Sequence, residues 1–172
     1  NATIASITAA LNSFQKVFTY VYDALVSGPK KRASVSDETV NATAFGFAYT
    51  FPGSVGFMMT LANDRMLFDK SQLDQAMGKT LELLSAERVG QVEALTAIVG
   101  LPAVRSAHQW ALENSKAGLG ADIVWQRQSE LRMSARVQPQ QIAALASAIG
   151  LATAKEEIIR QGELMHVDMS ER

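Results

Sequence analysis

The stretch FGFAYTFPGSVGFMMTL, residues 45–61, decides the fold. Before the turn its large side chains recur at every second position, and this period of two predicts a strand that begins near Val40. One face of that strand carries Phe45, Phe47, Tyr49 and Phe51. Pro52-Gly53 predicts the turn, because Pro presets φ and Gly accepts a positive φ. The next strand places Val55, Phe57, Met59 and Leu61 on one face, so the sequence predicts an antiparallel hairpin.

Helices are predicted on both sides of this hairpin. Over residues 3–26 apolar side chains recur three and four positions apart, and Ser27-Gly28-Pro29 ends the pattern. A polar linker follows over 30–38. Downstream we expect three helices: one from Asp69 or Ser71 to about Leu84, one from Ala86 to Val99, and one that begins at Pro102 and ends before Gly118. Their short connections predict that neighbouring helices pack together.

The last third of the chain predicts two more strands around a helix. Residues 122–137 alternate, with apolar side chains at odd positions, and so predict one long strand with a wet face. A helix begins at Pro139 and ends near Gly150, and residues 157–169 predict a final strand. That strand should pair with 122–137, because buried sheet backbone needs hydrogen-bond partners. The order αββαααβαβ predicts an α+β fold, with an antiparallel sheet of about four strands packed against helices.

Composition favours a single packed domain over residues 1–172. Apolar residues make up 48% of the chain and charged residues 19%, which is ordinary for a globular domain of this length. The chain begins with Asn1 and ends in strand-like sequence, so we expect it to be a piece of a longer protein. No secretory signal peptide is visible, and we expect a cytoplasmic protein.

Charge and residue usage exclude several function classes. Sixteen basic residues against seventeen acidic ones give a net charge of −1, so we expect no nucleic-acid partner. The chain has no Cys, which removes disulfides and thiol catalysis, and we expect no cofactor. Residues 39–63 carry no charge, but Pro52, Gly53 and Gly56 interrupt them, so we expect no membrane span.

Short motifs give little support to catalysis. Gly78-Lys79-Thr80 ends like a phosphate-binding loop, but Leu73 stands where its first Gly belongs and the triplet lies inside a predicted helix. Ser27-Gly28-Pro29-Lys30 fits an S-x-x-K pattern but ends a helix. His108 follows Val104 by one helical turn, which favours packing over chemistry. The spacing of His166 and Asp168 predicts a small polar pair on one strand face, without a third metal ligand nearby.

Two hypotheses of function follow. The first is a non-enzymatic module that binds a protein partner or a second copy of itself through apolar residues of the hairpin. The residues expected to bind that partner are Phe45, Phe47, Tyr49 and Met58. The alternative is a domain that binds a small molecule or anion through Arg132 and Arg136, with help from Lys30, Lys31 or Arg32. In that alternative, His166 or Asp168 would provide proton transfer.

Overall fold

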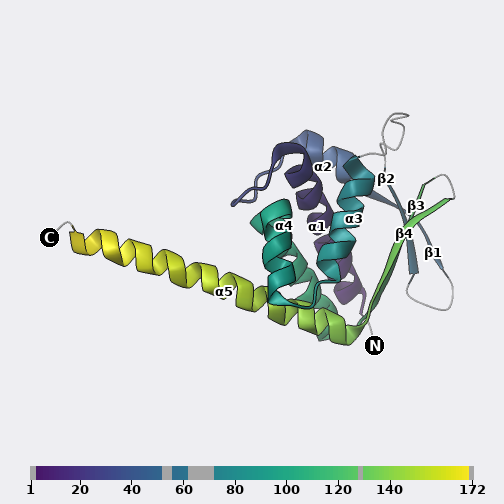
Figure 1. Ribbon diagram of the computed structural model, residues 1–172. Helices are drawn as coiled ribbons and strands as arrows, with labels where there is room; N and C mark the ends of the chain where they lie inside the picture. The colour runs from purple at the N-terminus through teal and green to yellow at the C-terminus, as the bar shows by residue number, and fades with distance from the viewer. Residues whose placement is uncertain (1–2, 52–55, 62–71, 128–129, 171–172) are drawn as a thin grey trace.

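The computed structural model describes residues 3–51, 56–61, 72–127 and 130–170, with only the backbone for 49, 51, 127, 131 and 155–170. Within these ranges the chain is α+β, with five helices and two separate two-stranded antiparallel sheets (Figure 1). The elements are α1 (Ile4–Ser27), α2 (Asp37–Thr43), β1 (Phe45–Phe51), β2 (Gly56–Leu61), α3 (Gln72–Leu84), α4 (Val89–Ala117), β3 (Ala121–Arg127), β4 (Glu130–Val137) and α5 (Pro139–Ser170).

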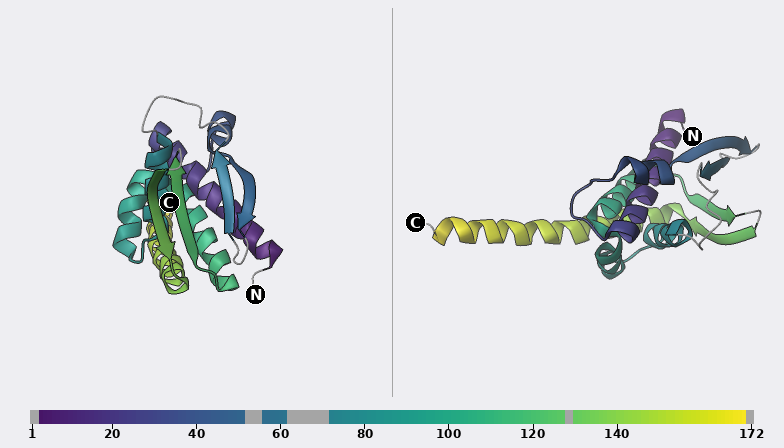
Figure 2. Two further views of the ribbon diagram at one scale, coloured as in Figure 1. Left: turned by 90° about the vertical axis from the view of Figure 1, so that its right-hand side faces the viewer. Right: turned by 90° about the horizontal axis from the view of Figure 1, so that it is seen from above.

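The core lies among the helices, and the two hairpins cover one side of it. Apolar side chains three and four positions apart on α1, α3, α4 and α5 are fully buried against one another. They include Val17, Phe18, Val21, Leu83, Leu84, Val92, Val99, Val104, Ile142, Leu145 and Ile149. The hairpins lie side by side in front of this helical layer and project beyond it, whereas α5 runs out on the opposite side (Figure 2).

A kink at Gly100 divides α4 into the two helical segments that the sequence predicted. Gly100 has φ 77°, a left-handed conformation that suits glycine, and Pro102 begins the second segment. A Cβ atom at position 100 would lie 2.9 Å from the backbone N and O of Lys30. Glycine therefore allows the loop after α1 to approach α4, where the Leu101 N–H donates to the Lys30 carbonyl at 3.2 Å.

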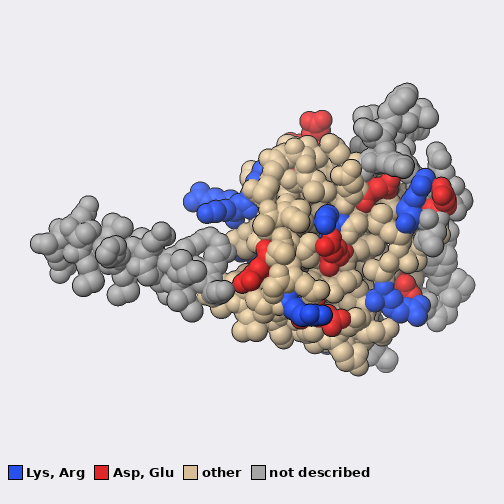
Figure 3. All heavy atoms as spheres, in the orientation of Figure 1, with Lys and Arg blue, Asp and Glu red and all other residues tan. Residues whose placement is uncertain are grey.

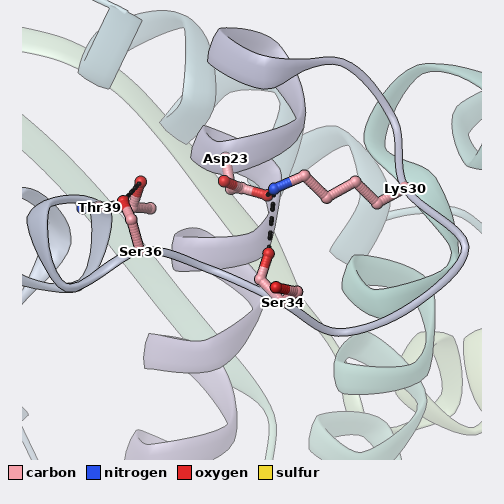
Figure 4. Close-up of polar contacts among 5 residues, drawn as sticks. All are labelled: Asp23, Lys30, Ser34, Ser36 and Thr39. Carbon is pink, nitrogen blue, oxygen red and sulfur yellow. Dashed lines mark hydrogen bonds and ion pairs between the residues drawn. The ribbon is translucent and has the colours of Figure 1, made fainter.

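Side-chain contacts fasten this loop, which the sequence predicted as a polar linker (Figure 4). The Lys30 Nζ lies 2.8 Å from Oδ2 of Asp23, whose side chain is only 7% exposed, and also donates to the Ser34 carbonyl at 3.0 Å. At the end of the loop, the Ser36 hydroxyl accepts from the Thr39 N–H at 3.2 Å and caps α2. The loop thus fixes where α2 begins.

The first hairpin differs from the prediction in its start and in its faces. The strand begins at Phe45 instead of Val40, because the Ser36 cap makes 37–43 helical. The shared face predicted for Phe45, Phe47, Tyr49 and Phe51 is wrong. A register shift lies between Phe47, which pairs with Met59, and Tyr49, which pairs with Met58. Such a bulge inserts one residue and reverses the alternation beyond it.

The predicted long strand at 122–137 is a hairpin, although its faces are as expected. As far as Trp125, odd positions meet odd positions across the strands, because Ile123 pairs with Ala135 and Trp125 with Met133. These four side chains are half-buried against the helices, and the even positions described between 122 and 136 are exposed. The two-residue connection by itself sets odd positions against even ones, but a register shift directly after Trp125 adds one residue and restores odd against odd. This hairpin therefore shows the same pattern as a single strand.

The predicted strand at 157–169 is also wrong, because α5 is one helix from Pro139 to Ser170. Gly150 has no positive φ and does not end this helix, and residues 151–161 are rich in good helix formers such as Ala, Leu, Lys and Glu. The expected pairing with 122–137 therefore does not form. His166 and Asp168 lie in the part of α5 that projects away from the sheets (Figure 1).

Candidate functional site

The first hairpin is held against α1 by Gln15. The Gln15 Nε2 donates to the Thr43 carbonyl at 2.8 Å, and its Oε1 accepts from the Phe45 N–H at 2.8 Å. Beside these bonds the Phe45 ring stacks on Phe14, with centroids 5.8 Å apart, and lies 5.0 Å from the Phe18 ring. Because one side chain bonds the backbone on both sides of Ala44, the start of β1 has a fixed position on the helix.

The second hairpin is held by Trp125 of β3. Its indole Nε1 donates to Oδ1 of Asp74 in α3 at 2.6 Å. The Trp125 ring also lies 6.2 Å from the ring of Phe18 in α1. Phe18 therefore contacts an aromatic ring from each hairpin, which places the two hairpins next to each other on one helical layer.

Between the hairpins lies an apolar groove, which we name the inter-hairpin groove. Its volume is about 290 Å³, close to the lower end of the range for ligand pockets, roughly 300–1,000 Å³. The floor comes from helices α1, α3 and α4 and consists mainly of Ile7, Ala10, Leu11, Phe14, Met77 and Trp110. The walls are Gly56 to Met59 of β2 and Ala121 to Trp125 of β3.

Both walls are strand edges. Successive side chains of a strand point to opposite faces, so a strand that lay with one face on the groove would line it with every second residue. Both walls consist of consecutive residues, which indicates that each strand borders the groove along its edge. β2 pairs only with β1 and β3 pairs only with β4 in the described part of the chain, where no backbone hydrogen bond joins β2 to β3. Each wall therefore presents backbone groups that have no strand partner, a recognised template for pairing with another chain.

The residues predicted to bind a partner have different positions. Phe45 and Met58 are half-buried and line the inter-hairpin groove. Phe47 is 66% exposed, although an aromatic side chain of this size is usually covered. Tyr49 lies opposite Met58, and its side chain is outside the part that the structure describes. Their role in binding stays a prediction.

Sequence reasoning did not single out several groove residues. The floor residues Leu11 and Trp110 received no role from the sequence, because helical spacing of apolar residues gives no sign that they border an open space. The sequence does set Val124 apart, because it is the one large apolar residue among the even positions of 122–136, which were expected to face solvent. Its side chain is 54% exposed at the edge of the groove.

The cations predicted for anion binding are paired with acidic neighbours. The Arg136 guanidinium lies 2.6 Å from Oδ2 of Asp122 across the hairpin, and Arg132 lies 3.1 Å from Oε2 of Glu130. Both arginines are on the exposed face of the sheet. Lys30 is paired with Asp23 at the α4 kink, so the structure does not bring it to these arginines. Anion binding by Arg132 and Arg136 stays a prediction that requires their ion pairs to open.

Comparison with protein-family models, with curated proteins and with solved structures finds no match to this chain.

Among the described helices, none combines the length and apolar character needed to cross a membrane. The described residues also contain no cluster of three or more side chains suited to hold a metal ion. On the face drawn in Figure 3, the coloured basic and acidic side chains are interspersed, as the near-zero net charge leads one to expect. The inter-hairpin groove is therefore the candidate functional site.

Proposed function

We propose that this chain is a protein-interaction module whose inter-hairpin groove binds an extended segment of another protein. The observation that carries the proposal is the pair of strand edges, from β2 and β3, that border one apolar groove without pairing to each other. An extended segment placed between them would complete a sheet across both hairpins. This is strand addition, in which main-chain hydrogen bonds supply affinity and side-chain pockets supply specificity.

The floor of the groove defines which segments fit. Side chains of a bound strand alternate between the two faces, so every second one would point toward Leu11, Phe14 and Trp110. These positions favour apolar residues, because burial of apolar surface contributes roughly 25 cal/mol per Å². The remaining side chains would lie beside Val124 and the polar outer face of β3, where mixed polar residues are tolerated.

A single extended segment suits this groove better than a folded second copy. A strand between β2 and β3 needs both of its own edges free, because each wall offers one row of backbone groups. In the described part of this chain, every strand already has one edge paired within its hairpin. The described hairpins therefore lack a strand that could enter the groove of a second copy without first unpairing.

Selection from a displayed library of ten-residue peptides tests the proposal. We expect the whole chain to enrich peptides with alternating apolar residues, whereas Val124→Glu and Met58→Glu variants should lose this enrichment. Ser134→Glu is the matched control, since Ser134 is exposed on β4 and does not line the groove. Equal enrichment by the Val124→Glu variant, or selection of peptides with helical spacing, would overturn the proposal.

Amide exchange on a selected peptide complex gives a second readout. Strand addition should slow hydrogen exchange at backbone amides of 56–59 and 121–125, because the new ladder protects them. Sedimentation of the free chain should show a monomer at micromolar concentration. A dimer that disappears with Val124→Glu would instead identify self-association through this groove and would contradict binding of a separate segment.

A further inference from the structure

A second pocket, independent of the groove, lies between α1 and α4, and we name it the α1–α4 pocket. It has a volume of about 380 Å³, and its polar lining includes Asn12, Lys16, Tyr20, Arg105, Ser106 and Gln109. Residues 12, 16 and 20 are four positions apart on α1, and residues 105 and 109 are four apart on α4. Each set therefore forms a stripe on its helix, and the two stripes face each other across the pocket.

Two cations line this pocket, Lys16 and Arg105. Within the described residues, neither Lys16 nor Arg105 forms an ion pair, and both are exposed to solvent. The acidic residue that also lines the pocket, Glu113, is already engaged. Its Oε1 accepts from Gln109 Nε2 at 2.6 Å and lies 3.5 Å from the Lys116 Nζ.

Three further side chains that line this pocket can donate hydrogen bonds. The side chains of Asn12, Tyr20 and Ser106 make no hydrogen bond to the described part of the protein. Asn supplies an amide donor, and Tyr and Ser each supply a hydroxyl donor. Together with the ammonium and guanidinium groups they offer five sets of donors around one solvent-accessible space.

We propose that the α1–α4 pocket binds the phosphate group of a small phosphate monoester. A phosphate presents several strongly accepting oxygens and about two negative charges, so it can accept from Arg105, Lys16 and the neighbouring hydroxyl donors at once. A carboxylate, with two oxygens and one charge, would leave some of these donors unused. The volume of about 380 Å³ leaves room for an ester group beside the phosphate.

Titration of the whole chain with inorganic phosphate, followed by backbone NMR at constant ionic strength, tests the site. We expect saturable shifts at Lys16, Tyr20, Arg105 and Ser106, and smaller effects from acetate. Glycerol phosphate should bind more tightly than inorganic phosphate. Equal affinities would overturn an ester ligand in favour of free phosphate, and equal shifts with acetate or chloride would overturn phosphate recognition altogether.

Variants connect the shifts to the cations. The double variant Lys16→Ala, Arg105→Ala should weaken phosphate binding by at least about tenfold, since both positive charges that line the pocket are lost. Lys79→Ala is the control, because Lys79 is paired with Glu82 at 2.6 Å and does not line this pocket. Unchanged phosphate affinity in the double variant would overturn the site. Peptide selection by the inter-hairpin groove should be the same in all three proteins.

Discussion

The indole Nε1 of Trp125 donates a hydrogen bond of 2.6 Å to the Asp74 carboxylate, which joins two residues 51 positions apart in sequence. Trp125 stands in β3, at one wall of the inter-hairpin groove, and Asp74 stands in the first turn of α3. The bond is partly buried, and the same ring lies against Phe18. It therefore fastens the second hairpin to the helical layer.

Trp125→Phe should lower the free energy of unfolding by about 1–3 kcal/mol, because it removes the donor and leaves a partly buried carboxylate without that partner. Urea unfolding measures the change. Asp74→Asn is the control, since an amide oxygen still accepts the indole N–H, and it should cost less. Wild-type stability in Trp125→Phe would mean that the bond does not fix the hairpin.

Gln15→Met should destabilise the chain by about 2–4 kcal/mol, as the Thr43 carbonyl and the Phe45 N–H both lose their partner. Met keeps a similar length and apolar stem, so the loss reports the hydrogen bonds and not a cavity. Gln109→Met provides the matched control, because its bond to Glu113 is exposed, and its cost should stay below about 0.5 kcal/mol. Similar costs in the two variants would contradict this role for Gln15.

Two glycines in helices should respond to alanine with opposite signs. Gly100→Ala forces a side chain into a positive φ and within 2.9 Å of Lys30 backbone atoms, so we expect a loss of more than about 2 kcal/mol. Gly150→Ala meets nothing within 4 Å inside α5 and should gain about 0.5–1 kcal/mol. Thermal unfolding of both variants checks the pair. A stabilising Gly100→Ala would contradict the close approach of the loop.

The helical layer and the first hairpin could be predicted from local signals in the sequence. Stripes of apolar residues on α1 and α3 have helical spacing, and Pro102 marks the second segment of α4. The register shift between Phe47 and Tyr49 left no such signal, because the apolar alternation continues through it. Where residues 122–137 turn back, residues 128 and 129 are Gln and Ser, which are not the usual residues of a tight hairpin turn.

The groove could not be predicted, because it depends on where two hairpins lie relative to each other. That placement comes from bonds between distant residues, Gln15 to Phe45 and Trp125 to Asp74, and no local pattern encodes them. The cations of the α1–α4 pocket were missed for a related reason. Lys16 and Arg105 are ordinary exposed helix residues until two helices bring them to one space.

Phe47→Ala separates stability from binding. If the face of Phe47 belonged to the core, loss of its ring would cost about 3–5 kcal/mol. Because Phe47 is 66% exposed, the cost should stay within about 0.5 kcal/mol, whereas Phe45→Ala should cost about 2–3 kcal/mol through its contacts with Phe14 and Phe18. Urea unfolding of the two variants gives both values.

Peptide binding, unlike stability, should depend on the Phe47 side chain. It pairs across the hairpin with Met59, a groove residue, so a bound segment that extends past the groove would cover its ring. Affinity for a selected peptide should therefore fall roughly fivefold in Phe47→Ala, equivalent to about 1 kcal/mol, with unfolding unchanged. The variant Lys79→Ala, which removes only a surface ion pair with Glu82 away from the groove, should leave both quantities unchanged. If the peptide bound Phe47→Ala as tightly as wild type, the docking surface would end at the groove walls and would exclude Phe47.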